Sequence, residues 1–154
     1  MAKKDVLARL QGASDALAAS FRRIGPNQWN LPITRSGRDG HDLLNYAMNL
    51  LELSGNAYLQ SLRMDSPAMT PQQIDAQARL NAERRRGRLV ATDFDDYLAS
   101  ARSLIILIDM ASDEIIAGTV WDNTTREVWL LRLADTLDKT NRIVISWLAQ
   151  QPNP

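Results

Sequence analysis

The segment TTREVWLLRLADTLDKTNRIVISWLAQQP, residues 124–152, decides the fold class. Its large side chains return every three or four positions, which is the spacing of one face of an α-helix. Thr124-Thr125-Arg126-Glu127 is typical of a helix start, and Pro152 ends the pattern. We therefore predict a long amphipathic helix that runs to about Gln151. Its core-facing stripe would consist of Trp129, Leu133, Thr136, Thr140, Ile143 and Trp147.

The same spacing predicts two long helices in the first half of the chain. Gly25-Pro26 ends the first of them, and the second runs from about Asp39 to Met64 before Ser66-Pro67 breaks it. The segment between them is rich in Pro, Gly and Asn and predicts an ordered loop, with Trp29 as a plug at one end of the bundle. The inward stripe of the first helix would consist of Leu7, Leu10, Ser14, Leu17, Phe21 and Ile24.

Two capping signatures mark the middle of the chain. Thr70-Pro71-Gln72-Gln73 opens a short polar helix that extends to about Arg86, and Thr92-Asp93-Phe94-Asp95 opens another long helix. The apolar run 104–108 belongs to that helix because it continues a longer 3.6-residue pattern, and no segment predicts a strand. The prediction is an all-α fold, an up-down four-helix bundle that forms a single domain over residues 1–154. The short polar helix would lie in the crossover between the second and third long helices.

Composition excludes several classes of function. Lys plus Arg and Asp plus Glu number 18 each, so no net charge attracts nucleic acid or an anionic membrane. The lack of cysteine excludes disulfides, thiolate metal sites and cysteine nucleophiles. The sequence contains neither a signal peptide nor an apolar span long enough for a membrane helix. We therefore expect a cytoplasmic protein whose partners do not include membranes or nucleic acids.

Polar residues interrupt the predicted core at one level. Thr136 and Thr140 lie in the middle of the last helix's stripe, and Tyr46 lies in the corresponding turns of the second helix. Helical bundles build ligand and metal sites from such inward polar positions. Ordinary packing is the favoured explanation, because threonine can bond a carbonyl of the preceding turn and a buried tyrosine needs one partner. A small polar cavity is the alternative.

Four phrases of the sequence, taken in order, resemble a known superfamily. They are NQWNLPITRSG (27–37), GRDGHDLLNYAMNLLELSG (37–55), TDFDDYLASARSLIILI (92–108, preceded by Asn81) and LRLADTLDKTNRIVISWLA (131–149). Over nearly its whole length the chain is thereby similar to the DinB/YfiT-like superfamily. That superfamily includes the N-terminal domain of mycothiol-dependent maleylpyruvate isomerase and the bacillithiol transferases. The resemblance implies a helical bundle, homodimers and, where a metal is present, three histidine ligands.

The family's three metal-binding positions fall on Tyr46, Thr136 and Thr140, the same residues that helical spacing singles out. A neutral threonine hydroxyl is a poor ligand for first-row metals, and a phenol must lose its proton to bind one well. The resemblance therefore implies a member without a metal and without any other cofactor.

These observations lead to two alternative functions. The first is a metal-free bundle that binds a small molecule in a remnant cavity between the second and last helices, lined by Tyr46, Asn49, Thr136 and Thr140. The second is a thiol-dependent transferase or isomerase that works without the metal and uses Tyr46 as a proton donor or as a group that orients the thiol. No catalytic residue is assigned, and enzymatic activity is not favoured. The broad apolar surface of the last helix and the resemblance both point to a homodimer.

Two charged features complete the sequence analysis. His41 is the only histidine, and we interpret it as a surface or loop-packing residue, with a general base as the alternative. Arg84-Arg85-Arg86-Gly87-Arg88 is the one dense basic cluster. A solvated helix end is favoured over contact with a phosphate, a carboxylate ligand or nucleic acid, because cations suit a helix C-terminus.

Overall fold

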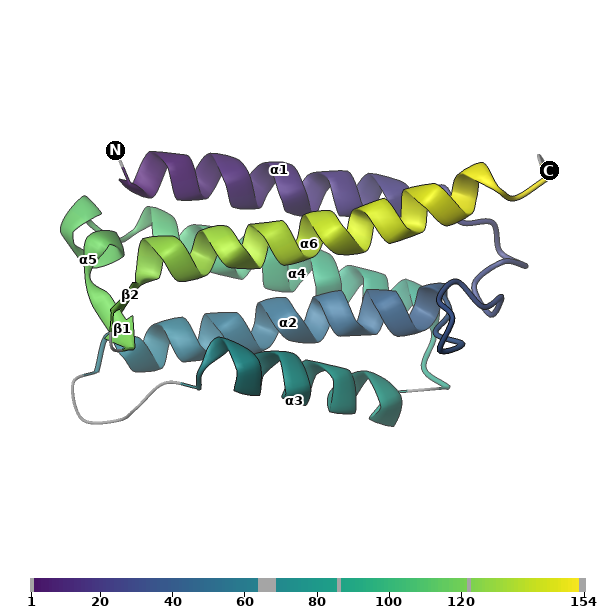
Figure 1. The fold of residues 1–154 in the computed structure, drawn as a ribbon, viewed down its shortest axis with the longest axis horizontal. Helices are drawn as coiled ribbons and strands as arrows, with labels where there is room; N and C mark the ends of the chain where they lie inside the picture. Colours follow the sequence, from purple (N-terminus) through teal and green to yellow (C-terminus); the bar gives the residue numbers. More distant parts are fainter. Residues whose placement is uncertain (1, 64–68, 86, 122, 153–154) are drawn as a thin grey trace.

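The computed structural model describes residues 2–63, 69–85, 87–121 and 123–152. Its elements are mostly helices (Figure 1). They are α1 (Ala2–Arg22), α2 (Gly40–Ser61), α3 (Pro71–Arg84), α4 (Val90–Asp109), α5 (Asp113–Ala117), β1 (Thr119–Trp121), β2 (Thr124–Thr125) and α6 (Arg126–Ala149). The predicted all-α class is confirmed apart from the two very short strands. The predicted helix ends at Met64 and Arg86 and the break at Ser66-Pro67 lie outside the described residues.

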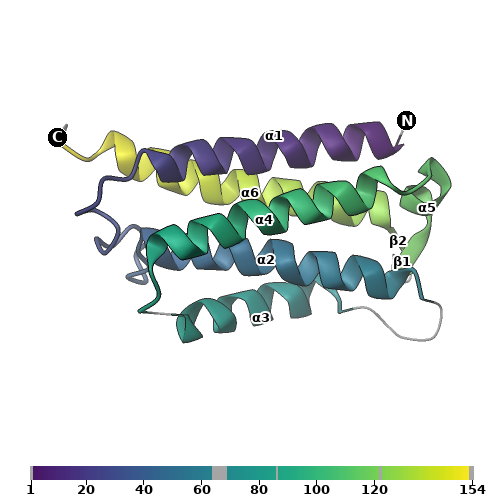
Figure 2. The same cartoon turned by 180° about the vertical axis from the view of Figure 1, so that it is seen from behind.

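The long helices lie side by side along one axis (Figures 1 and 2). Helix α1 packs against α6 and α4, and α2 packs against α4 on one side and α3 on another. Helices α1 and α6 run in one direction, while α2 and α4 run in the other, because α3 carries the chain back between them. The finer prediction of an up-down four-helix bundle is not confirmed. Of the four long helices, α2 and α4 follow one another but run in the same direction, so the directions alternate along the chain only when α3 is counted. No described helix meets the length and apolarity that a membrane crossing requires.

The core-facing side of α6 is rotated slightly from the predicted stripe. Trp129, Leu133, Thr140 and Trp147 are buried as predicted, whereas Thr136 is only half-buried and Ile143 is exposed. The remaining core positions of α6 are Leu130, Ala134, Leu137 and Val144. Most of the apolar surface that favoured a dimer is thus buried within the chain, and the homodimer stays a prediction.

Capping explains where several helices begin. Thr70 accepts a hydrogen bond from the Gln73 backbone N–H, and Thr125 accepts one from that of Val128, so both predicted N-caps are confirmed. The predicted start at Thr92 is wrong: α4 begins at Val90, and Leu89 precedes it without a side-chain cap bond. Asp93 does not cap the helix, because its carboxylate is engaged by His41 and Arg85.

Helix α5 and the β1–β2 hairpin, neither of which was predicted, join α4 to α6 at one end of the bundle (Figure 1). Arg126 holds this end together. Its guanidinium donates to the Ser61 hydroxyl at 2.9 Å, to the Ser61 carbonyl at 2.6 Å and to the Ile115 carbonyl at 2.8 Å. Because Ser61 is the last residue of α2, Arg126 places a positive charge at a helix C-terminus, where the helix dipole favours it.

Candidate functional site

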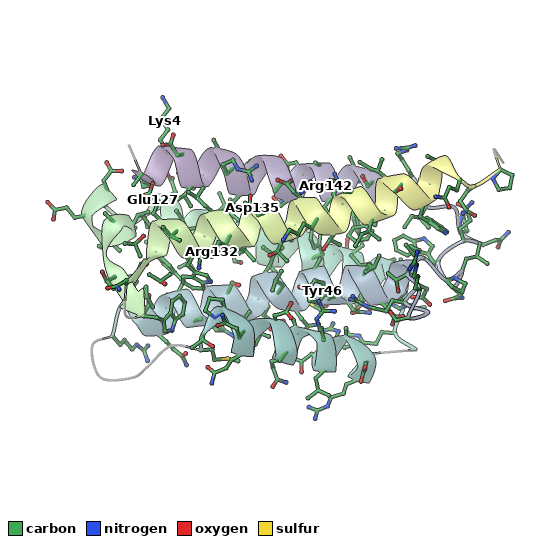
Figure 3. All side chains as sticks on the ribbon, viewed as in Figure 1. Lys4, Tyr46, Glu127, Arg132, Asp135 and Arg142 are labelled. Carbon is green, nitrogen blue, oxygen red and sulfur yellow. The ribbon has the colours of Figure 1, made fainter. Side chains whose placement is uncertain are left out.

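Tyr46 lies in α2 and points toward α3, as Figure 3 shows on the ribbon. It is 4 % exposed, and its hydroxyl donates a hydrogen bond to Asp75 of α3. The guanidinium groups of Arg38 and Arg79 lie 5.1 Å and 5.0 Å from the centre of its ring. Burial, and then the bond to Asp75, raise the pKa of the Tyr46 phenol well above its ordinary value.

The side chains of the other predicted site residues donate hydrogen bonds to backbone carbonyls of their own helices. The hydroxyl of Thr136 donates to the Arg132 carbonyl, and that of Thr140 to the Thr136 carbonyl, each at 3.1 Å. The Asn49 amide donates to the Asn45 carbonyl at 2.8 Å. No hydrogen bond among the described residues joins Tyr46 to either threonine, and none of the cavities described here is lined by the predicted site residues. The threonines therefore make the bonds that ordinary packing predicts.

Replacing Tyr46 by phenylalanine should destabilise the fold by about 1 kcal/mol at neutral pH, since it removes a hydrogen bond to a partly exposed carboxylate. Burial alone would raise the pKa of Asp75, but hydrogen bonds from Tyr46 and Arg79 outweigh it and lower that pKa. A lowered carboxylate pKa gives stability that is present above the unfolded value and lost as the pH falls through the folded value. Urea unfolding measured over a range of pH should therefore show that the difference in free energy of unfolding between Tyr46→Phe and the unmodified protein decreases at acidic pH. A difference that is constant with pH would contradict this account.

A cavity of about 700 Å³, here named the end cavity, opens at the opposite end of the bundle from Arg126. It lies between the C-terminal end of α1, the loop that follows it and the N-terminal end of α4. Its apolar lining residues are Phe21, Ile24, Pro26, Trp29, Leu89, Val90, Ala91 and Phe94, and the others are Arg22, Asn30, His41, Gly87 and Arg88. Most of its wall is thus apolar, and much of it is aromatic.

Local sequence explains how the wall is built. Gly25-Pro26 follows α1, and the chain turns back so that Trp29 stacks on Phe21 with ring centres 6.0 Å apart. Gly40 opens α2 directly below: a Cβ atom there would lie 3.1 Å from both Ile24 and Trp29. A glycine therefore lets Trp29 approach the start of α2 this closely without a shift of the neighbouring side chains. The predicted role of Trp29 as an end plug is consistent with this position.

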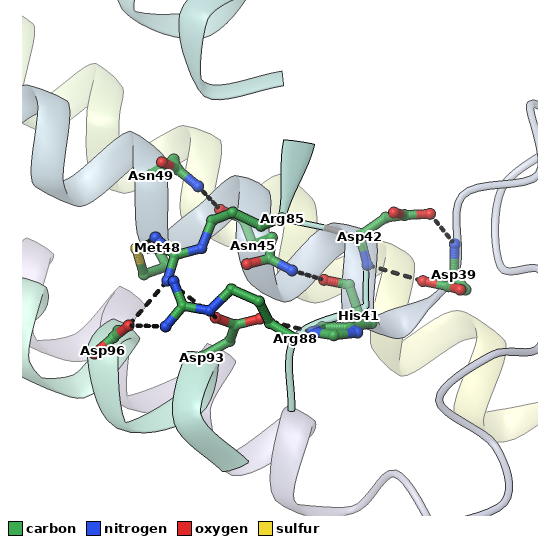
Figure 4. Close-up of polar contacts among 10 residues, drawn as sticks. All are labelled: Asp39, His41, Asp42, Asn45, Met48, Asn49, Arg85, Arg88, Asp93 and Asp96. Atoms are coloured by element: carbon green, nitrogen blue, oxygen red, sulfur yellow. Dashed lines mark hydrogen bonds and ion pairs between the residues drawn. The ribbon is translucent and has the colours of Figure 1, made fainter. Parts of the chain in front are cut away.

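His41 lies on the wall of the end cavity and is held by a buried carboxylate (Figure 4). Its Nε2 lies 2.7 Å from Asp93, which is 0 % exposed. Arg85, whose side chain is 19 % exposed, donates to Asp93 at 3.1 Å and to Asp96 at 2.9 Å. Arg88 adds longer ion pairs of 3.7 Å to Asp93 and 3.6 Å to Asp96. The start of α2, the end of α3 and the start of α4 are joined at this point.

The bond to Asp93 determines which ring nitrogen of His41 carries the proton when the ring is neutral. Because Asp93 accepts at Nε2, the neutral ring carries its proton there, and Nδ1 has no hydrogen-bond partner among the described residues. A residue that lines the cavity can therefore offer an acceptor, or a weak base, to a bound molecule. Within the described part of the chain, no group of three or more His, Cys, Asp or Glu side chains is placed to hold a metal ion.

The structure changes two interpretations of charged residues. His41 is not simply a surface residue, since its side chain is only 12 % exposed and is bonded to Asp93. The arginine cluster divides: Arg84 is exposed, whereas Arg85 is mostly buried in ion pairs, and Arg86 lies outside the described residues. No sequence signal links His41 to Asp93, because 52 residues separate them.

Comparison with known proteins identifies no relative for this site. The resemblance to the DinB/YfiT-like superfamily therefore rests on the sequence motifs and stays a prediction. No family model, no curated protein and no solved structure matches the chain.

Proposed function

We propose that the protein binds a small, largely apolar organic molecule in the end cavity, with His41 as its fixed polar contact. The observation that carries the proposal is the cavity itself, about 700 Å³ in volume and lined mainly by aromatic and aliphatic side chains. Small-molecule sites are typically concave, about 300–1,000 Å³ in volume, and apolar with few polar groups. The end cavity agrees with each of these properties.

The exposure of the cavity wall supports the same proposal. Leu89 is 74 % exposed, and Trp29 and Phe94 are only partly buried. A bound apolar molecule would remove this surface from water, which is favourable by about 25 cal/mol per Å².

The buried ion pairs beside the cavity also favour a site. A carboxylate such as Asp93, taken completely out of water, is costly unless it is paired and hydrogen-bonded. Asp93 positions His41, the one side chain of the protein whose ordinary pKa lies near neutrality. His41 in turn lies on the wall of the end cavity, the largest of the cavities described here. This is the arrangement expected of a ligand contact that must keep one orientation.

The earlier predictions remain separate proposals. A remnant cavity at Tyr46, Asn49, Thr136 and Thr140 between α2 and α6, a four-helix bundle of the DinB/YfiT type, a homodimer and a cytoplasmic location rest on sequence. The thiol-dependent alternative uses the Tyr46 hydroxyl, which in this structure donates a hydrogen bond to Asp75. It predicts thermal stabilisation by low-molecular-weight thiols that is lost in Tyr46→Phe.

Filling the end cavity should abolish most of its affinity for a neutral apolar probe. Ala91 lines the cavity and is exposed, so Ala91→Trp occupies space without removing a core contact. We expect it to weaken binding of N-phenyl-1-naphthylamine, followed by probe fluorescence, about tenfold or more, equivalent to about 1.4 kcal/mol.

The matched control is Ala16→Trp, which places the same side chain at an exposed position of α1 outside the cavities described. It should bind the probe like the unmodified protein. The proposal fails if the unmodified protein binds no probe, or if both tryptophan variants reduce binding equally while circular dichroism shows them folded.

A further inference from the structure

We infer that the molecule bound in the end cavity is an anion, an organic carboxylate or sulfonate with an apolar body, and that Arg22 binds its charged group. This inference rests on the proposed function, because it names the chemical class of the ligand for the same cavity. It depends on which charges line the cavity and on how each of them is already paired.

Among the residues that the structure describes, the cavity has positive but no negative lining groups. Arg22 and Arg88 are the arginines of this set that line it, and none of its described lining residues is an Asp or a Glu. Arg88 is already shared between Asp93 and Asp96. Among the described residues, no carboxylate forms an ion pair with Arg22. One cation at the cavity is therefore available to a ligand.

The neighbouring charges do not cancel this surplus. Arg85 and Arg88 offset Asp93 and Asp96, two cations against two anions. A neighbouring cavity of about 270 Å³ shares His41 with the end cavity and is lined by Asp39 and Asp42. These two carboxylates accept backbone N–H groups at the start of α2, where the helix dipole already favours negative charge.

The position of Arg22 suits an anion at the mouth of the cavity. Arg22 is the last residue of α1, and its guanidinium carbon lies 5.1 Å from the centre of the Phe94 ring. A cation–π contact of this kind uses no N–H donor in a hydrogen bond, so the N–H donors of the guanidinium remain available to an anion. Those donors match the two oxygens of a carboxylate or two oxygens of a sulfonate. The apolar body of the ligand would then lie against Trp29, Val90 and Phe94.

A pair of related fluorescent probes can test the charge directly. N-phenyl-1-naphthylamine is neutral, and 1-anilinonaphthalene-8-sulfonate carries the same aromatic framework with one sulfonate. We expect Arg22→Gln to weaken binding of the sulfonate about fivefold and to change binding of the neutral probe less than about twofold. Added salt should weaken binding of the sulfonate more than that of the neutral probe, because it screens an exposed charge.

Arg132→Gln is the matched control, since Arg132 is exposed on α6 and does not line the end cavity (Figure 3). It should leave the affinity for both probes unchanged, and circular dichroism should show both variants folded. Equal affinity of Arg22→Gln and the unmodified protein for the sulfonate would overturn the inference, while binding of the neutral probe would leave the proposed function standing. If neither probe binds the unmodified protein, both proposals fall.

Discussion

Replacing Asp93 by alanine should lower the free energy of unfolding by about 3 kcal/mol or more, the range measured when one partner of a buried ion pair is removed. Asp93 is fully buried, and its carboxylate is bonded to both Arg85 and His41. Asp93 and Asp96 both accept from Nη2 of Arg85, so without Asp93 this mostly buried guanidinium keeps only the partly exposed Asp96 among these two acceptors. Its Nε atom is already buried without a partner, so it cannot offset the loss.

Asp96→Ala provides the matched control for this substitution. Asp96 accepts from the same arginine, but its side chain is 45 % exposed, so we expect a loss of less than about 1 kcal/mol. Urea unfolding followed by circular dichroism measures both values. Equal losses in the two variants would contradict the view that burial of Asp93 makes it important. Because His41 would also lose its partner, Asp93→Ala should weaken probe binding in the end cavity.

Replacing Arg126 by alanine should cost about 2–3 kcal/mol, from three hydrogen bonds of roughly 1 kcal/mol each. Two of its acceptors are backbone carbonyls, and the Ser61 carbonyl lies at the C-terminus of α2. The arginine therefore joins α6 to α2 and to α5 at once. The loss should be accompanied by faster amide hydrogen exchange in residues 113–121, because Arg126 bonds the Ile115 carbonyl within this segment.

The control for Arg126 is Arg132→Ala, on the same helix. Arg132 is exposed, so its truncation should change stability by less than about 0.5 kcal/mol. Exchange rates near α5 should not respond to it. If Arg126→Ala were as stable as Arg132→Ala, the hydrogen bonds at this end of the bundle would contribute little to the fold.

Periodicity and capping predicted most of the helices because both act over a few residues. The cap at Thr70 depends on the next three residues alone, and the structure has this cap as predicted. The stripe of α6 was predicted only in part, since Thr136 and Ile143 lie at the edge of a buried face centred nearer Leu137. A rotation of this kind is decided by the neighbouring helices, which the pattern of one helix does not contain.

The end cavity could not be predicted for a similar reason. Its wall combines residues 21–30, His41 and residues 87–94, and its polar contact depends on a pair separated by 52 residues. Asp93 was interpreted as part of a helix start because Asp is common there. Its actual partners come from α2 and the end of α3, so only the three-dimensional arrangement assigns its role.

The pairing of α1 with α6 has a consequence for how the chain matures. Arg9 forms ion pairs of 2.6 Å with Asp135 and 3.0 Å with Asp138, and the first of these joins residues 126 positions apart. During synthesis, α1 leaves the ribosome long before α6 has been made. The apolar side of α1 that packs on α6 therefore stays exposed to solvent while α2 to α5 are synthesised. Contacts of such long sequence separation form late and slow the final closure of the bundle. Apolar surface exposed in this way makes an incomplete chain prone to aggregation, and in this protein the completion of α6 removes it.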